Sequence, residues 1–245
     1  MRTPLTALTP NPSPSGEGGK KGRRNSPSGA ALTPNPSPSG EGRKAGRTTH
    51  KPAHAPGQVR IIGGEWRRRL LPVASGPGVP EGLRPTPDRV RETLFNWLGQ
   101  DLSSWSCLDL CAGTGALGLE AASRGASHVV LVENNAALVR QLQQLVQQLE
   151  ASQVQVRQSD ALSVLREYGS GQRQVDVVLL DPPYDANWYA AALKAAVAAV
   201  CADGYLYLEA GRQWTEEELA ELGWRCVRHL KAGQVHAHLL QPIKE

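Results

Sequence analysis

A four-residue segment, Asp-Pro-Pro-Tyr, carries the most specific chemical signal in the chain. It comprises Asp181, Pro182, Pro183 and Tyr184 and follows the apolar run 177–180. Prolines remove two N–H donors, so the segment offers acceptors, namely the Asp181 carboxylate and the Pro182 carbonyl. Two acceptors match the two hydrogens of a planar amino group, and a tyrosine ring can stack on a base. We therefore predict a catalytic site that orients an exocyclic amine for direct group transfer, without a covalent enzyme intermediate.

A glycine-rich turn ends another apolar run and opens a helical stretch. Glycines at this point allow tight turning and close approach of a ligand to backbone N–H groups. The spacing of Gly113, Gly115 and Gly118 also fits a dinucleotide fingerprint. Asp109 argues otherwise, because its carboxylate would repel a pyrophosphate and would suit the cationic aminoacyl end of S-adenosylmethionine. The predicted cofactor is S-adenosylmethionine, and the predicted cofactor-binding residues of this turn are Asp109, Ala112, Gly113, Thr114 and Gly115.

Acidic residues follow the next two apolar runs. Glu133 comes directly after the run 129–132, where a carboxylate can accept both ribose hydroxyls of an adenosine. Asp160 follows the next run and can cap a helix, accept a hydrogen bond from an adenine amino group, or do both. We therefore expect Glu133 to bind the ribose, and Asp160 with Ala161 to lie at the adenine.

Strands and helices alternate from residue 105 onward. Strands are expected at 107–110, 129–132, 154–156, 175–180 and 205–208, and helices at 116–123, 136–150, 161–168, 188–200 and 216–222. Continuous apolar strands between helices indicate an α/β fold, with a parallel sheet covered on both faces. Two final runs, 224–230 and 234–240, predict a closing antiparallel hairpin.

Arginines are concentrated upstream of this region. Residues 59–62 and 66–73 predict two strands, which would place Arg67 and Arg69 on one face and Arg68 on the other. A helix is expected after them, with Thr86 as its cap and Arg91 turned towards solvent. Since a guanidinium can bind two phosphate oxygens, we predict that RNA is contacted by Arg60, Arg67, Arg68, Arg69, Arg84, Arg89 and Arg91.

Charge and composition vary strongly along the chain. Residues 1–57 carry a net charge of +7, residues 58–92 carry +3, and residues 93–245 carry −6. The first segment contains ALTPNPSPSGEG twice and is rich in Pro, Ser and Gly, so we expect a disordered tail. The predicted domains are this tail (1–57), an RNA-contacting extension (58–100) and a catalytic domain (101–245).

The remaining composition predicts neither a metal site nor a membrane span. The four cysteines lack the paired spacing of a zinc site. Apolar runs long enough to cross a bilayer are missing, and the first residues lack the apolar stretch of a signal peptide. A cytoplasmic protein is expected.

Several segments together resemble the bacterial 16S rRNA guanine-N2 methyltransferase family. The resemblance covers about three quarters of the chain and includes RIIGGEWRRRLLPV, GLRPTPDRVRETLFNWL, DLCAGTGALGLEAASRGA, VVLLDPPY and AGQV. It implies a Rossmann-like class I fold with a seven-stranded sheet, and methylation of a guanine N2 in the small ribosomal subunit or its assembly intermediate. It places the cofactor loop on 109–115, the ribose acid on Glu133, the adenine contact on Asp160 and the catalytic tetrapeptide on 181–184. A monomer is expected.

Two other kinds of function remain open from the residues. Methyltransferases acting on adenine N6 in DNA or on a protein glutamine also use an acceptor-Pro-Pro-aromatic segment, more typically beginning with Asn. Asp181 and the flanking segments favour the rRNA family. A non-catalytic RNA-binding module is the alternative of another class, although every expected pocket position is present.

Overall fold

The computed structural model describes residues 57–80, 83–171, 174–183 and 188–243. All of them belong to one compact unit, 52–245. The predicted tail 1–57 lies outside the described residues except for residue 57. Within the described part, none of the helices is both long and apolar enough to cross a membrane.

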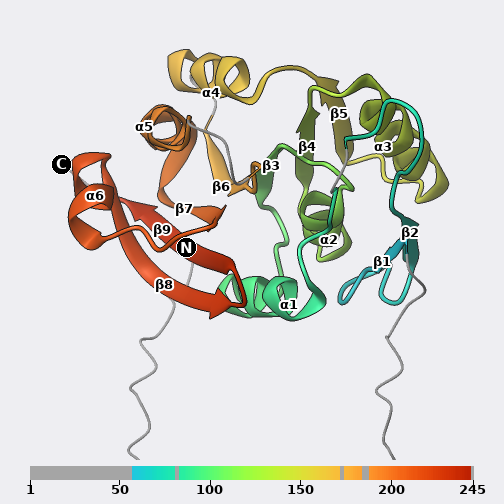
Figure 1. Ribbon diagram of the computed structural model, residues 1–245, viewed down its shortest axis with the longest axis horizontal. Helices are drawn as coiled ribbons and strands as arrows, with labels where there is room; N and C mark the ends of the chain where they lie inside the picture. Colours follow the sequence, from blue (N-terminus) through green and yellow to red (C-terminus); the bar gives the residue numbers. More distant parts are fainter. Residues whose placement is uncertain (1–56, 81–82, 172–173, 184–187, 244–245) are drawn as a thin grey trace, which may run out of the picture. The chain divides into compact units, whose positions relative to one another are not determined.

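A seven-stranded sheet forms the centre of this unit (Figure 1). Its strand order is β5-β4-β3-β6-β7-β9-β8, and only the pairs that involve β9 are antiparallel. The strands are β3 (Ser106–Leu110), β4 (His128–Glu133), β5 (Val154–Gln158), β6 (Val175–Leu180), β7 (Val200–Ala210), β8 (Trp224–Ala232) and β9 (Val235–Pro242). The predicted C-terminal antiparallel hairpin is thus confirmed as β8 and β9.

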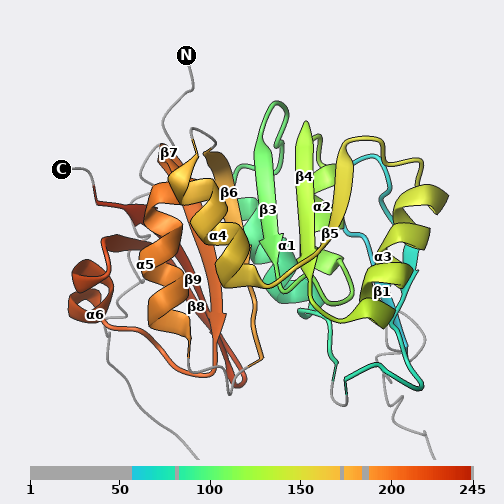
Figure 2. The same cartoon turned by 90° about the horizontal axis from the view of Figure 1, so that it is seen from above.

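Helices cover both faces of the sheet, as the alternating pattern predicted (Figure 2). They are α1 (Asp88–Trp97), α2 (Ala116–Ser123), α3 (Ala136–Gln148), α4 (Ala161–Ser170), α5 (Tyr189–Ala199) and α6 (Glu216–Glu221). Neighbouring residues of β4 point into different cores: Leu131 packs in a cluster with Leu119 of α2, and Val130 packs in a cluster with Val164 of α4. Strands buried on both faces explain why their sequences are continuously apolar.

The N-terminal strands are shorter than predicted. β1 (Gln58–Arg60) pairs with β2 (Leu70–Pro72), and residues 65–68 form a turn instead of the start of the second strand. The reason is docking on α2: Glu65 N–H donates to the Ser123 carbonyl at 2.7 Å, and Trp66 N–H donates to Ser123 Oγ at 2.9 Å. These bonds use the free end of α2 and hold the backbone away from a β ladder.

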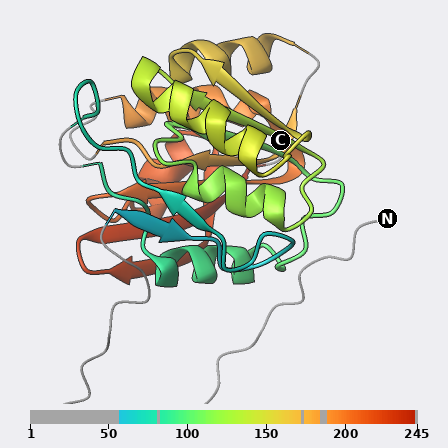
Figure 3. The same ribbon diagram turned by 90° about the vertical axis from the view of Figure 1, so that its right-hand side faces the viewer.

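The N-terminal segment lies between α1 and α2 (Figure 3), and a buried carboxylate anchors it there. Glu120 of α2 is fully buried and accepts hydrogen bonds from the backbone N–H groups of Ile62 and Gly63, at 2.8 and 2.7 Å. It also forms ion pairs with Arg91 of α1 and with Arg124. These donors compensate the buried charge of Glu120. The segment predicted as an N-terminal extension is therefore held against α1 and α2 by a buried cluster of paired polar groups.

Candidate active site

The carboxyl ends of β3, β4 and β6 meet at one edge of the sheet. Leu110, the last residue of β3, pairs with Val132 of β4 and with Leu180 of β6. From β3 the sheet continues through β4 and β5 on one side and through β6 and β7 on the other. Ligands of open parallel sheets bind where the strand order reverses in this way. The structure therefore brings the glycine turn after β3 next to Asp181, which directly follows β6.

The glycine turn has a backbone that only particular residues accommodate. Gly113 and Gly115 have φ values of 53° and 77°, in the left-handed region that favours glycine. A Cβ on Gly115 would come within 2.7 Å of the Leu142 side chain of α3. The turn is closed by the bond from Gly115 N–H to the Ala112 carbonyl at 2.7 Å, and Ala112 N–H donates to Val132 of β4. Thr114 is buried inside it.

Asp109 of β3 is buried beneath the glycine turn and is bonded to the helix that follows the turn. Its side chain is 1% exposed, and Oδ2 accepts a hydrogen bond from Gly118 N–H at 2.8 Å. Burial raises the pKa of Asp109 to about 8, and the charges of Asp181 and Glu133 add to the shift. The enclosed carboxyl group shapes the start of α2, so the predicted direct pairing of Asp109 with a cationic ligand is not supported by its position.

Glu133 lies at the end of β4, as predicted, and faces the glycine turn. Its Oε2 accepts from Gly113 N–H and its Oε1 accepts from Asn135 N–H, both at 2.9 Å. Each carboxylate oxygen can accept a second hydrogen bond. The side chain is therefore held in a fixed orientation and can still accept the hydroxyl groups of a ribose.

Asp160 caps α4, which confirms one of its two predicted roles. Its side chain accepts from Ser163 N–H at 2.8 Å and remains exposed, whereas the neighbouring Ala161 is buried. An adenine contact at Asp160 stays a prediction, and the exposed carboxylate keeps free acceptor positions for it.

Asp181 is held by Thr86, a residue predicted to have another role. Thr86 was expected to cap α1, but Pro87 occupies that position, and the Thr86 hydroxyl instead donates to Asp181 Oδ2 at 3.1 Å. Burial raises the pKa of Asp181 to about 6, and the Thr86 bond opposes that shift. Pro182 is buried and Pro183 is exposed. The predicted stacking residue, Tyr184, lies outside the described residues.

Glu209 and Tyr207 of β7 also reach this site, and the sequence analysis missed both. Glu209 is 2% exposed, and its Oε1 accepts from the Tyr207 hydroxyl at 2.7 Å. Burial raises the pKa of Glu209 to about 8, and the Asp181 charge raises it further. An acidic residue inside the apolar strand YLYLEA was the available signal, since a buried carboxyl group needs a specific partner.

The arginines predicted to contact RNA differ in their exposure. Arg60 is half-buried. Arg91 is wrongly predicted, because its side chain is fully buried and bonded to the carboxylates of Glu120 and Asp88 and to the backbone carbonyls of Thr86 and Arg60. A guanidinium with no exposed surface cannot reach a phosphate. The arginines with exposed side chains are Arg67, Arg68, Arg69, Arg84 and Arg89.

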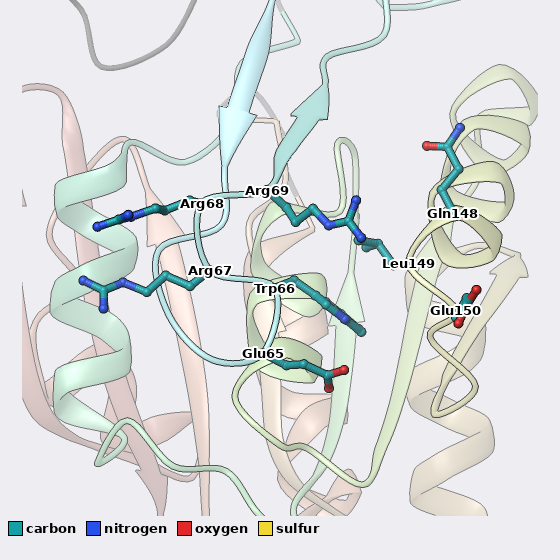
Figure 4. Close-up of a pocket in the computed structure, with 8 residues that line it drawn as sticks. All are labelled: Glu65, Trp66, Arg67, Arg68, Arg69, Gln148, Leu149 and Glu150. Carbon is teal, nitrogen blue, oxygen red and sulfur yellow. The ribbon is translucent and has the colours of Figure 1, made fainter.

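The turn at residues 65–69 borders a hollow of about 540 Å³ beside the end of α3 (Figure 4). Its lining residues are Glu65, Trp66, Arg67, Arg68, Arg69, Gln148, Leu149 and Glu150. Arg67 and Arg68 point to one side, whereas Arg69 points to the other, towards Leu149. The predicted sharing of a face by Arg67 and Arg69 is therefore wrong, because a turn replaces the expected strand and Arg68 has a φ of 73°. The turn docks at the end of α2, while the glycine turn lies at its beginning.

Comparisons with known proteins agree with this architecture. A family model described as conserved hypothetical protein 95 matches residues 59–241. The ribosomal RNA small subunit methyltransferase D of Escherichia coli K12 is 48% identical over 135 residues, 55% of this chain and 65% of that protein. The match thus spans slightly less than two thirds of this relative. The Haemophilus influenzae protein of the same name is 42% identical over 155 residues, 62% of this chain and 76% of that protein.

Solved structures show the same fold. A putative methyltransferase from E. coli has a TM-score of 0.66 and 38% identity, and the match covers 77% of this chain and 100% of that one. The T. thermophilus 16S rRNA N2 G1207 methyltransferase, solved with AdoMet and guanosine, has a TM-score of 0.60 and 25% identity over 76% of this chain and 50% of that one. These neighbours confirm the predicted class I methyltransferase fold. The chain therefore belongs to the family described as conserved hypothetical protein 95, and with it to the ribosomal RNA small subunit methyltransferase D proteins.

Proposed function

We propose that this protein uses S-adenosylmethionine to methylate the exocyclic N2 amine of a guanine in 16S rRNA. The observation that carries the proposal is the position of Asp181 and Pro182, at the end of β6 and beside the glycine turn. An acceptor-rich segment next to a nucleoside pocket suits transfer to a base amine. Relatives named as small-subunit rRNA methyltransferases, and a structural neighbour solved with guanosine, support the substrate.

The residues around the turn fit the proposed cofactor. Glu133 has oriented acceptors that would bind the ribose hydroxyls, and Asp160 and Ala161 would border the adenine. A Cβ on Gly113 would lie 3.4 Å from Cδ1 of Leu83. Because glycine has no Cβ, a ligand can lie close to the backbone at this position. When bound, S-adenosylmethionine supplies an electrophilic methyl group on a sulfonium.

Asp181 and Pro182 would act on the amine itself. The free Asp181 oxygen and the Pro182 carbonyl accept the two amine hydrogens, which turns the nitrogen lone pair towards the incoming methyl group. As the N–C bond forms, the bond between the methyl group and the sulfonium sulfur would break, with S-adenosylhomocysteine as the leaving group. The nitrogen becomes more acidic and would pass one hydrogen as a proton to the Asp181 carboxylate and from there to water. An ionised Asp181 also stabilises the positive charge that develops on this nitrogen. In this scheme Tyr184 stacks on the base.

The RNA is proposed to approach over the exposed arginines. Arg84 and Arg89 flank Thr86, the partner of Asp181, and are therefore placed to hold phosphates near the target base. The turn with Arg67 and Arg68 would contact RNA further away, beyond the length of α2. The proposed substrate is the small subunit or its assembly intermediate, bound by a monomer.

A transfer assay with several acceptors tests this function. Labelled S-adenosylmethionine is incubated with the protein and, separately, with small subunits, naked 16S rRNA, duplex DNA and protein. Label in 16S rRNA alone supports the proposal. Label in DNA or protein would favour the related amine methyltransferases, and cofactor binding without transfer to any acceptor would favour the RNA-binding module.

A further inference from the structure

The Thr86 hydroxyl lies near two carboxyl groups, those of half-buried Asp181 and buried Glu209. It donates to Asp181 Oδ2 at 3.1 Å, and it also influences the pKa of Glu209, which is 2% exposed. A threonine hydroxyl carries one hydrogen, so it cannot donate to both carboxyl groups at once. If both groups were ionised, one would lack this donor and two like charges would face each other in a buried site.

The surroundings of Glu209 favour its neutral form. Burial and the neighbouring Asp181 anion disfavour its charged form, whereas the Tyr207 hydroxyl, which donates to Oε1, opposes this effect. Arg91 is the cation that faces Glu209, but its guanidinium is already bonded to the carboxylates of Glu120 and Asp88. Charge compensation for an ionised Glu209 is therefore weak.

We propose that Glu209 is a positioning residue for Asp181 and acts through Thr86. Protonated Glu209 donates to Thr86 Oγ1, and the single Thr86 hydrogen is thereby directed at Asp181. The bonds then run in one direction, from Tyr207 through Glu209 and Thr86 to Asp181. One Asp181 oxygen is fixed by Thr86, and the other is left for the substrate amine. This inference rests on the proposed catalytic role of Asp181.

The acidities of the two groups define the pH range of this arrangement. Burial raises the pKa of Asp181 to about 6 and that of Glu209 to about 8. Between these values Asp181 is mainly ionised and Glu209 mainly protonated. Above about pH 8, Glu209 loses its proton, competes for the Thr86 hydrogen and repels Asp181. Activity is therefore expected to fall on the alkaline side.

Glu209→Gln and Glu209→Ala separate this role from simple packing. A glutamine side chain has the shape of the protonated acid and can both donate to Thr86 and accept from Tyr207. It is expected to keep kcat at neutral pH within about threefold of wild type and to lose the alkaline decline. Alanine is expected to lower kcat by about 10- to 100-fold, because Asp181 loses its fixed orientation. The KM for S-adenosylmethionine should stay unchanged in both variants.

Thr86 and Asp176 provide the accompanying variants. Thr86→Ser keeps the hydroxyl and should retain activity, whereas Thr86→Val should lower kcat as Glu209→Ala does. Asp176→Asn changes another buried carboxyl group, which accepts from Ser106 at the other end of β6, and should leave the pH profile unchanged. An alkaline decline that persists in Glu209→Gln, or a Glu209→Ala variant as active as wild type, would overturn the proposal.

Infrared spectroscopy tests the protonation of Glu209 independently of the proposed function. In difference spectra between pH 7 and pH 9.5, the carbonyl band of protonated carboxylic acids should lose more intensity in the wild type than in Glu209→Gln, because Asp109, whose pKa is also about 8, ionises in both proteins. The band does not depend on catalysis. If the wild type shows this larger loss but methylates no guanine amine, the proposed function fails and the proton on Glu209 stands. If it methylates guanine but the loss is the same in both proteins, the inference fails.

Discussion

The Thr86 hydroxyl donates a 3.1 Å hydrogen bond to Asp181, although 95 positions separate the two residues in the chain. This bond joins the segment before α1 to the end of β6. The Thr86 carbonyl in turn accepts from Arg91 Nε at 3.1 Å, and Arg91 pairs with Glu120 of α2. The N-terminal segment therefore helps to hold the end of β6, where the proposed catalytic segment begins, in addition to any role as an RNA contact.

Replacing Asp181 by alanine is expected to stop transfer and to spare the cofactor site. The variant lacks the acceptor that orients the amine and stabilises its developing charge, so kcat should fall by roughly 10³-fold. Glu133 and the glycine turn keep their mutual bonds, so S-adenosylhomocysteine should bind with unchanged affinity in calorimetry. A large loss of that affinity would show that Asp181 faces the cofactor instead of the substrate.

Asp109 is expected to make the protein less stable as the pH rises. Its pKa is about 8 in the folded state against 3.8 ordinarily. Between about pH 4 and pH 8 the folded protein keeps a proton that the unfolded chain releases, so the free energy of unfolding falls with increasing pH. Asp109→Asn keeps an acceptor for Gly118 N–H and cannot ionise. Its melting temperature should exceed that of wild type by more at pH 8 than at pH 5, and an equal difference at both values would contradict the assignment.

Glu120→Gln is expected to destabilise the fold strongly. The change removes the charge that compensates buried Arg91 and Arg124, and breaking such a buried pair costs about 3–5 kcal/mol. Glu167→Gln is the matched control, because its pair with Arg157 is partly exposed and should be worth less than about 1 kcal/mol. Denaturant unfolding of both variants measures the difference. Similar losses in the two would mean that the network does not anchor the N-terminal segment.

The turn that carries Arg67 and Arg68 allows a test of RNA contact, with the neighbouring Arg69 as an internal control. Replacing Arg67 and Arg68 by alanine should weaken rRNA binding and lower the slope of log affinity against log salt by about one to two units. Arg69→Ala should change the slope less, since Arg69 points towards Leu149 (Figure 4). Titrations at several salt concentrations give the slopes. Unchanged slopes in the double variant would leave Arg84 and Arg89 as the phosphate contacts.

The sequence predicted the parts of the fold that depend on local pattern. The boundaries of α2 and β6 agree with the expected ranges, because apolar periodicity and the glycine turn act within a few residues. Asp181, Glu133 and Asp160 were also found at or just after the predicted strand ends. A parallel sheet then places these ends at one edge without further information.

The errors concern residues whose partners are distant in the chain. Arg91 was assigned to RNA because nothing near it in the sequence reveals Glu120, 29 positions away. The second N-terminal strand was predicted too long because Glu65 docks on Ser123 of α2. Thr86 has a side chain suited to a helix cap, and its bond to Asp181 exists only in the folded protein. Long-range contacts of this kind override local propensity.

The identity of the methylated atom is the most direct test of the account. Small subunits that lack the modification are incubated with the protein and S-adenosylmethionine, and the 16S rRNA is digested to nucleosides and analysed by mass spectrometry against synthetic standards. We expect N2-methylguanosine with wild-type protein and none with Asp181→Ala. A methyl group on a ring nitrogen, on adenine N6 or on a ribosomal protein would contradict this expectation.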